Sequence, residues 1–159
     1  MITQEYVKHL FYYKDGHLYW KIKTTNRVKI GDKVGTLKDG YLQTRVLGKI
    51  CKVHRLIFLI HYGYIPKFLD HINNDRSDNR IENLREATHT ENMRNCKTRS
   101  HNASGIKNVR WNRKNKVWTV RLMINKKETH FGCFKDVELA ELVAIEARNK
   151  FFKEFANHG

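Results

Sequence analysis

The apolar segments of this 159-residue chain are short, and polar turn-forming residues interrupt them throughout. The longest apolar run, Leu56–Ile60, falls far short of the ~20 residues that a membrane-spanning helix needs. We therefore expect no membrane span. The N-terminus also lacks the charged stub and apolar stretch of a secretion signal.

Turn-forming residues divide the first part of the chain into small predicted elements. Lys14-Asp15-Gly16, Lys38-Asp39-Gly40 and Gly48-Lys49 are each typical of a tight turn. Gly63 is placed to end a helix, and Pro66 cannot continue one. The pattern predicts a helix over 3–12, strands over 17–22, 34–37, 41–47 and 50–53, and a helix over 54–62.

The remainder of the chain alternates a loop, a helix and three strands. Thr88-x-x-Glu91 is a capping box, so a helix is expected from there to about Cys96. Asp136 is expected to cap a last helix that reaches about Phe155. Strands are expected over 107–112, 117–124 and 128–134. The apolar stripe of the last helix is predicted to be Leu139, Val143, Ala147, Phe151 and Phe155.

These elements predict an α+β fold with two domains. The first, 1–96, begins with a small antiparallel sheet and ends in a strand, loop, strand and helix over about 68–96. Residues 97–104 are expected to form an exposed basic linker. The second domain, 105–159, is a three-stranded sheet with one helix.

The charge of the chain indicates its class of partner. Lys and Arg number 31 against 16 acidic residues, a net charge of +15 that attracts polyanions. An anionic membrane is the weaker alternative, because no long basic amphipathic helix is present. Three cysteines without a C-x-x-C spacing argue against a disulfide framework or a cysteine-rich zinc site. We expect a nucleic-acid-binding protein of a reducing cytoplasm.

One set of polar residues carries the chemistry of a phosphodiester hydrolase. Asp70 can hold a hard divalent cation, and Asn92, on the capped helix, can add its carbonyl oxygen. A strand followed by a helix is expected to bring these two side chains together. His71 points to the other side of an extended strand, where it can take a proton from water. Asn83 can hold the imidazole in position by a hydrogen bond.

Each of these residues, taken alone, is ordinary, and other residues compete for the same roles. His54 and His89 are alternative bases, although the position of His54 at the start of an apolar helix favours a structural role. Asp75 and Asp78 are alternative metal ligands, but local bonds that shape their loop explain them better. Arg76, Arg80 and Arg85 fit phosphate contacts, and a solvated basic face fits them equally.

The same residues resemble the phage HNH endonucleases of the homing type, which carry a ββα-metal site. The resemblance spans roughly residues 53–97. It implies that Asp70 and Asn92 are metal ligands, His71 the general base and Asn83 the residue that orients it. The family name expects a histidine at the last position, and Asn92 matches a homing subgroup. This oxygen ligand favours Mg²⁺, or else Mn²⁺. The stretches that carry the resemblance are His54–Leu56, Leu69–Arg85 and Thr88–Asn95.

The C-terminal part resembles the plant Apetala-type, or ethylene-response, DNA-binding domain over about 103–156. The motifs are Val109-Arg110, Trp118 with Arg121, and Phe131-Gly132-x-Phe134 before an Ala-rich helix. Trp111 stands where the family usually has a polar residue, so the family's contacts with individual bases are not assigned to this chain. One of Trp111 and Trp118 is expected under the helix and the other toward DNA. The expected DNA contacts are Arg110, Arg113, Trp118 and Arg121.

These observations favour an endonuclease that nicks or cuts double-stranded DNA with a divalent metal. We expect it to act as a monomer on DNA rather than as an obligate dimer. A DNA-binding regulator with an inactive nuclease fold is the main alternative, and a basic protein that coats nucleic acid is the third. Neither alternative needs the set Asp70, His71, Asn83 and Asn92.

Overall fold

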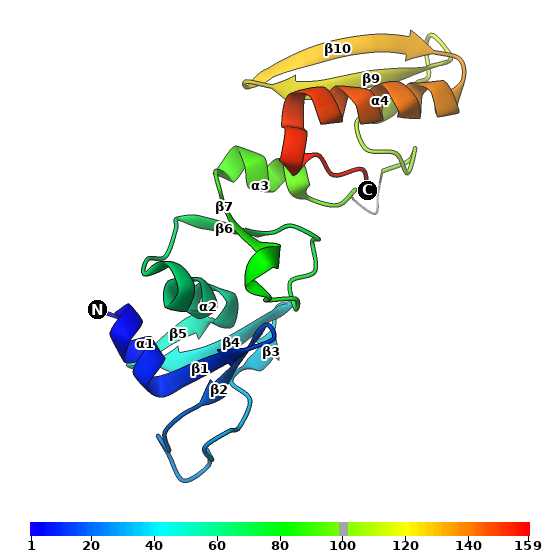
Figure 1. Cartoon of the computed structure of the whole chain (residues 1–159). Coiled ribbons are helices and arrows are strands. Elements are labelled where there is room, and N and C mark those ends of the chain that lie inside the picture. Colours follow the sequence, from blue (N-terminus) through cyan, green and yellow to red (C-terminus); the bar gives the residue numbers. More distant parts are fainter. Residues whose placement is uncertain (99–101) are drawn as a thin grey trace. The chain divides into compact units, whose positions relative to one another are not determined.

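The protein is described by a computed structural model over residues 1–98 and 102–159 (Figure 1). It contains two compact units, Met1–Thr88 and His89–Gly159. Their helices and small antiparallel sheets confirm the predicted α+β class. Part of the expected linker 97–104, residues 99–101, lies outside the described residues. Within the described ranges, no helix is both long and apolar enough to cross a membrane.

The first unit begins with helix α1 (Gln4–Leu10) and a hairpin of β1 (Phe11–Lys14) and β2 (His17–Trp20). Thr3 caps α1 by accepting a hydrogen bond from the Tyr6 N–H. The helix expected over 3–12 is shorter because Phe11 leaves it to pair with Trp20. The turn residues between the strands have positive φ, as a two-residue hairpin requires. This pairing outweighs the helical spacing of the apolar residues before it.

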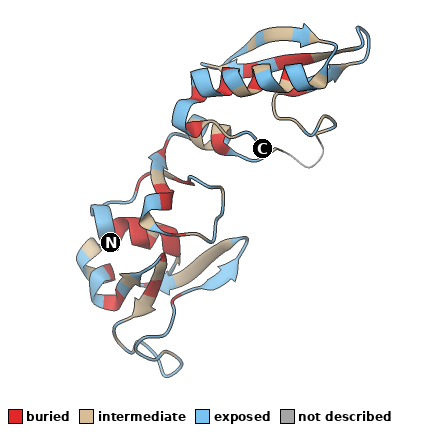
Figure 2. Ribbon diagram, turned by 45° about the vertical axis from the view of Figure 1, so that its right-hand side comes forward, coloured by how far each residue is buried: buried red, intermediate tan, exposed pale blue. Residues whose placement is uncertain are grey.

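A second sheet has the strand order β3-β4-β5, with tight turns between neighbouring strands. Its strands are β3 (Thr36–Lys38), β4 (Tyr41–Val46) and β5 (Lys49–Lys52), close to the predicted ranges. Helix α2 (Val53–Tyr62) follows at once and ends at Gly63, in the left-handed conformation as predicted. Figure 2 shows α2 as largely buried. The core of the unit packs around it from α1, β1, β2, β4 and β7.

The last part of the first unit is the hairpin that carries the expected chemistry. Strand β6 (Phe68–His71) pairs antiparallel with β7 (Leu84–Ala87). Between them lie a polar loop over 72–80 and one 3-10 turn, η1 (Ile81–Asn83). The hydroxyl oxygen of Tyr13 accepts a hydrogen bond from the Ile81 N–H of this turn at 3.2 Å. The hairpin is thereby attached to the β1–β2 hairpin.

The second unit is a three-stranded sheet of order β10-β9-β8, covered by one long helix. Its core joins Val109, Val120 and Leu122 of the sheet to alanines of α4. The elements are α3 (His89–Asn95), β8 (Val109–Asn112), β9 (Val117–Ile124), β10 (Lys127–Phe134), α4 (Val137–Phe152) and the 3-10 turn η2 (Lys153–Phe155).

The buried face of α4 differs from the predicted apolar stripe. Leu139 and Phe151 are 48% and 38% exposed. The buried positions are instead one residue later along most of the helix, and their small alanines let the helix lie close to the sheet. The sequence periodicity gave equal weight to large apolar residues, whereas packing selects the side chains that fit. These buried residues are Ala140, Ala144, Ala147, Arg148 and Phe152.

Helix α3 belongs to the second unit, whereas the sequence-based boundary at residue 96 placed it in the first domain. The Lys107 ammonium donates to the Arg94 carbonyl at 2.8 Å and to the Cys96 carbonyl. These bonds satisfy carbonyls at the end of the helix, which have no intrahelical partner. The Arg94 guanidinium lies 4.7 Å from the ring centre of Phe152. Where the functional domains begin and end stays a prediction.

Candidate functional site

Strand β6 ends with two buried residues that can take part in hydrolysis, Asp70 and His71. Both side chains are 5% exposed. Asp70 lies opposite Arg85 in the strand register, and its Oδ2 accepts from the Arg85 Nε at 2.9 Å. A second nitrogen of the same guanidinium lies 2.9 Å from this oxygen. The carboxylate is therefore oriented and partly neutralised by its strand partner.

Arg85 thus orients Asp70, a role that the sequence of the chain did not reveal. It was expected to contact DNA, but its side chain is only 15% exposed and its guanidinium holds Asp70. A strand-pairing register was needed to see this contact, because the two residues are fifteen positions apart. Its expected contact with DNA stays a prediction.

The ring of His71 lies in a small group of aromatic side chains. The rings of His54 and His71 are 4.9 Å apart, edge to face. The Tyr41 ring lies 5.2 Å from His54 and 6.2 Å from His71. Burial, together with the smaller effect of the adjacent His71, lowers the pKa of His54 to about 3. His54 is therefore neutral near pH 7, which agrees with the structural role predicted for it.

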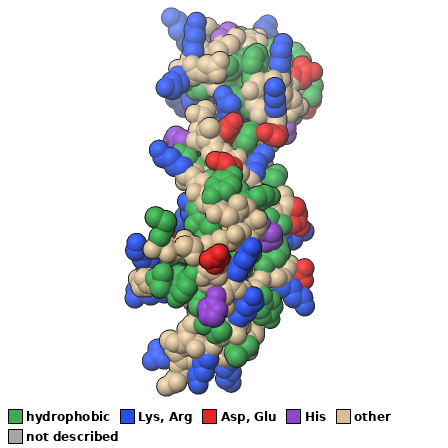
Figure 3. All heavy atoms as spheres, turned by 60° about the vertical axis from the view of Figure 1, so that its left-hand side comes forward, with side chains coloured by type: hydrophobic (Ala, Val, Ile, Leu, Met, Phe, Trp, Pro, Cys, Tyr) green, Lys and Arg blue, Asp and Glu red, His purple; other side chains and the backbone are tan. Residues whose placement is uncertain are grey.

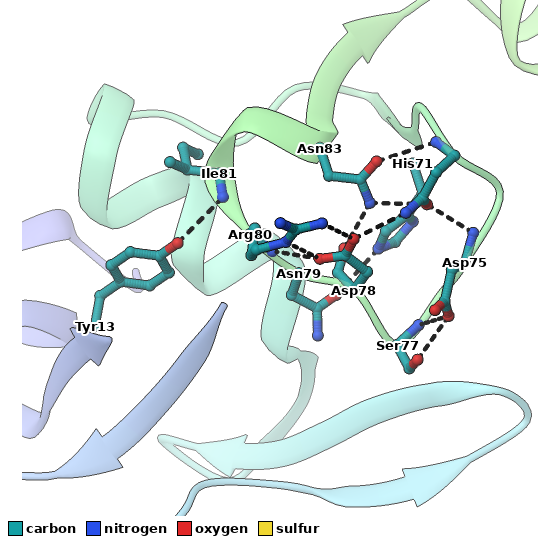
Figure 4. A network of polar contacts seen from close by, with 10 residues as sticks. Tyr13, His71, Asp75, Ser77, Asp78, Asn79, Arg80, Ile81 and Asn83 are labelled. Atoms are coloured by element: carbon teal, nitrogen blue, oxygen red, sulfur yellow. Dashed lines mark hydrogen bonds and ion pairs between the residues drawn. The ribbon is translucent and has the colours of Figure 1, made fainter. Parts of the chain in front are cut away.

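A dense set of local hydrogen bonds shapes the loop between β6 and β7 (Figure 4). Asp75 accepts from the N–H and hydroxyl of Ser77, and these bonds lower the pKa of its carboxyl. Asp78 accepts from Arg80 at 2.7 and 2.8 Å, and this contact holds its pKa well below the usual range. The prediction that both aspartates shape the loop is confirmed. Such Asx-type bonds fix a turn without regular structure.

Asn83 anchors this loop from inside. Its Oδ1 accepts from the Asn73 N–H at 3.0 Å, and its Nδ2 donates to the Asn73 Oδ1 and the Asp78 carbonyl. These bonds use the amide to organise the loop. The amide that contacts the His71 ring is that of Asn79, whose Oδ1 lies 3.0 Å from Nε2. That Asn83 orients the ring itself stays a prediction.

The arginines of the loop have partners within the first unit. Arg80 forms an ion pair with Asp78, and the Arg76 guanidinium lies 5.0 Å from the centre of the Tyr41 ring. Lys52 lies 3.8 Å from the same ring centre. The cationic groups of Arg76 and Lys52 therefore both lie against the Tyr41 ring, which neighbours His54 and His71. Sequence analysis named neither Tyr41 nor Asn79, because each becomes informative only through what it contacts.

Asn92, the second expected metal ligand, lies on α3 in the second unit and is partly buried. Its expected convergence with Asp70 stays a prediction, because Asp70 belongs to the first unit. Over the described residues, no three His, Cys, Asp or Glu side chains gather into a metal-binding group. The expected ligands, one carboxylate and one amide, would not form such a cluster of three. These hard oxygen donors fit Mg²⁺, which usually keeps several of its waters.

The sheet of the second unit has one face covered by α4 and one open face. Val109, Val120 and Leu122 point to α4, so Arg110 and Arg121, which neighbour them in the strands, point to the open side. Arg113 is exposed in the turn after β8. Figure 3 shows Lys and Arg side chains projecting from this unit. A cavity of about 730 Å³ is lined by residues that include Lys97, Lys107, Arg110, Arg113 and Arg121.

The two tryptophans of this sheet do not divide between its faces as predicted. Trp111 and Trp118 are direct cross-strand partners, and their rings lie 4.9 Å apart. Opposed residues of an antiparallel pair point to the same side, here the side of Val109 and α4. Trp118 packs against the core, while Trp111 is 44% exposed. The contact of Trp118 with DNA stays a prediction.

Comparison with known proteins agrees with the hairpin chemistry. The sequence model of a family described as HNH endonuclease matches residues 51–94. Protein 3.8 of Escherichia phage T7 is 32% identical over 98 residues, which cover 59% of this chain and 78% of that protein. No solved structure is significantly similar. The family match includes α2, the β6–β7 hairpin and most of α3.

Proposed function

Because the chain belongs to the HNH endonuclease family, we propose that it is a metal-dependent enzyme that hydrolyses phosphodiester bonds in double-stranded DNA. The observation that carries this proposal is the buried pair at the end of β6, Asp70 held by Arg85 and His71 held by Asn79. Burying such groups is costly unless they are bonded, and such sites are commonly functional. The enzyme is of the phage homing type and acts as a monomer in the host cytoplasm.

The proposed roles follow the chemistry of each side chain. Asp70 and Asn92 hold a divalent cation, Mg²⁺ or else Mn²⁺. When bound, this ion supplies charge stabilisation for the phosphate oxygens and the leaving 3′ oxygen. His71 accepts a proton from the attacking water. Asn83 keeps the loop over 72–80 in the shape that the site requires.

DNA binding is assigned to both units. We propose that the second unit is a DNA-binding domain of the Apetala type, with contacts by Arg110, Arg113 and Arg121, while Trp118 supports the sheet from its core side. In the first, exposed Arg76 extends the basic surface beside Tyr41. Phosphate contacts by such cations release counterions, so binding weakens steeply with salt.

A plasmid assay tests the enzymatic proposal directly. Supercoiled plasmid is expected to be nicked or cut with Mg²⁺ and to stay intact with EDTA. His71→Ala should lower the cleavage rate at saturating DNA by about 10²–10⁴-fold, the usual contribution of a general base. His9→Ala, at an exposed position on α1, is the matched control and should cleave normally. Undiminished nicking by His71→Ala would remove this residue from the mechanism.

A DNA-binding regulator with an inactive nuclease fold is the second candidate. The specific observation in its favour is the ion pair of Asp70 with Arg85, which competes with a cation for the carboxylate. A regulator would bind DNA with salt-dependent affinity but show no EDTA-sensitive cleavage with any plasmid or divalent metal. Its affinity would be the same for the parent chain and His71→Ala.

A further inference from the structure

The amide of Asn79 and the imidazole of His71 form a buried contact inside the β6–β7 loop. Asn79 is 1% exposed and lies eight residues after the histidine, at the end of the loop. Its Oδ1 lies 3.0 Å from the Nε2 of the ring. Neither the family match nor the sequence pattern singles out this asparagine.

We infer that Asn79 is the positioning residue that fixes the tautomer of His71, a role that rests on the proposed nuclease function. An amide oxygen can only accept, so a hydrogen bond at Nε2 requires that Nε2 carry the proton. The neutral ring then has its lone pair on Nδ1. Nδ1 is therefore the atom that receives the proton from water.

The tautomer decides which ring atom takes part in hydrolysis. As the water oxygen forms its bond to phosphorus, its proton moves to Nδ1 of His71. The bond from phosphorus to the 3′ oxygen breaks, and its electron pair stays on that oxygen. The ring is then an imidazolium, and the Asn79 Oδ1 stabilises the charge that has formed, as a carboxylate does in other histidine dyads.

The Nδ2 of Asn79 lies on the side of the amide opposite the ring. Figure 4 shows its Nδ2 pointing away from His71. Among the described residues this nitrogen has no protein partner, but Asn79 lines a cavity of about 500 Å³. Polar side chains of His17, Lys33 and Ser77 share that cavity, which is large enough for water.

Asn83 acts one step further away. Its amide bonds to Asn73 and Asp78, at the start and near the end of the loop. Asp78 also pairs with Arg80, so Asn79 lies between two anchored residues. Asn83 therefore fixes the conformation of the loop, and the loop in turn places Asn79 beside the ring. A change at Asn83 should act through folding, whereas a change at Asn79 should act on the ring.

Nitrogen NMR of the full chain, labelled at histidine and kept at a pH where the ring is neutral, reads the tautomer without DNA or metal. His71 is expected as the Nε2–H form. Asn79→Leu removes the acceptor and should shift the population toward Nδ1–H. Asn79→Asp keeps an oxygen acceptor and should retain Nε2–H. Ser77→Ala, in the same loop but bonded to Asp75, is the control and should leave the tautomer unchanged.

Plasmid cleavage provides the second measurement. Asn79→Leu should lower kcat by about 10–100-fold with little change in KM, as is typical when the partner that orients a histidine is lost. Asn79→Asp should restore kcat to within a few-fold of the parent chain. A purely structural role would lower the amount of folded protein and leave kcat per folded molecule unchanged.

The two measurements separate this inference from the proposed function. An Nδ1–H tautomer in the parent chain would overturn the role of Asn79 even if cleavage is confirmed, and needs no variant to fold. Parent-level kcat in folded Asn79→Leu would overturn it as well. Absence of any cleavage, with the tautomer responding as expected, would refute the nuclease and leave the contact as a structural one.

Discussion

The two units of the molecule bury polar groups in different ways. In the first unit, buried polar residues lie on one hairpin and on the helix before it, and each of those on the hairpin bonds to a neighbour within the same hairpin. In the second, they are dispersed: Arg148 is fully buried, whereas Arg110 and Arg121 lie on the open sheet face. The buried polar residues are His54, Asp70, His71, Asn79 and Asn83 in the first unit, and Asn95, Thr119 and Arg148 in the second.

This difference separates chemistry from binding. A buried imidazole and carboxylate need fixed partners, because a low dielectric makes unpaired groups costly and paired ones directional. Cations that bind phosphate work best at the surface, where counterions can be released. The first unit concentrates its buried polar groups at one place, and the second packs an apolar cluster between its sheet and α4, with Arg148 buried on the same helix.

The largest expected effect is on the stability of each unit when one of its buried polar side chains is removed. Asn83→Ala leaves the Asn73 N–H and the Asp78 carbonyl without their partner and should lower the free energy of unfolding of the first unit by about 3 kcal/mol. Thr119→Ala is the counterpart in the second unit. Its hydroxyl lies 3.9 Å from the Cys133 sulfur, which is a weak contact, so its loss should cost less than about 1 kcal/mol.

Hydrogen exchange read by mass spectrometry reports on each unit separately. Protection should fall in the β6–β7 hairpin of Asn83→Ala and stay nearly unchanged in β9 of Thr119→Ala. Equal losses in the two variants would contradict the idea that buried polar groups are concentrated at one functional place.

The second effect is the pH dependence of stability. The pKa of His54, about 3 when folded, lies below its unfolded value of about 6.5, so the unfolded state binds more protons between these values. Its contribution is complete above pH 6.5 and is lost as the pH falls. At pH 5 this loss is about 2 kcal/mol. His54→Gln should remove it, whereas His9→Gln, at an exposed position, should not.

Lys107 extends this test to the second unit. Burial, together with the smaller effect of the Arg148 charge, lowers the pKa of Lys107 to about 8, so stability should rise as the pH increases from about 8 to 10.5. The two units should thus respond in the same direction but in separate pH windows. Urea unfolding from pH 4.5 to 10, read by hydrogen exchange in each unit, measures both. A single shared window would contradict this assignment.

The smallest expected effect concerns the open face of the second unit. The double variant Arg110→Ala with Arg121→Ala should weaken DNA binding about 10-fold and reduce the slope of log affinity against log salt by about 2, one per lost phosphate contact. The control, Lys135→Ala with Lys150→Ala, removes the same charge elsewhere in this unit. Fluorescence anisotropy at several salt concentrations measures both. Equal changes in the two double variants would show that only net charge matters.

Local signals predicted much of this fold. The Gly63 cap, the tight turns and the three C-terminal strands follow from residues that permit only a few backbone conformations. The loop aspartates were also predictable, since their bonds are to residues two positions away. Where the physical cause is local, the sequence contains it.

Features that depend on partners distant in the chain were not predictable. Strand β1 forms because β2 pairs with it, and the buried side of α4 is chosen by the sheet beneath it. Likewise, Asn79 and Arg85 gain roles only through contacts with His71 and Asp70. The order of residues in the motif predicted the reacting groups, but the residues that hold these groups in place could be identified only from the tertiary structure.

The assignment of α3 to the second unit bears on how such chains can be recombined. A junction within residues 97–104 would separate the helix from the lysine that completes its last turn and from the ring of Phe152. The sequence match to the HNH family, 51–94, crosses from one unit into the other. Exchange of the whole 89–159 segment would keep the helix with its supports. A chimera joined within residues 97–104 would contain α3 without its contacts to Lys107 and Phe152.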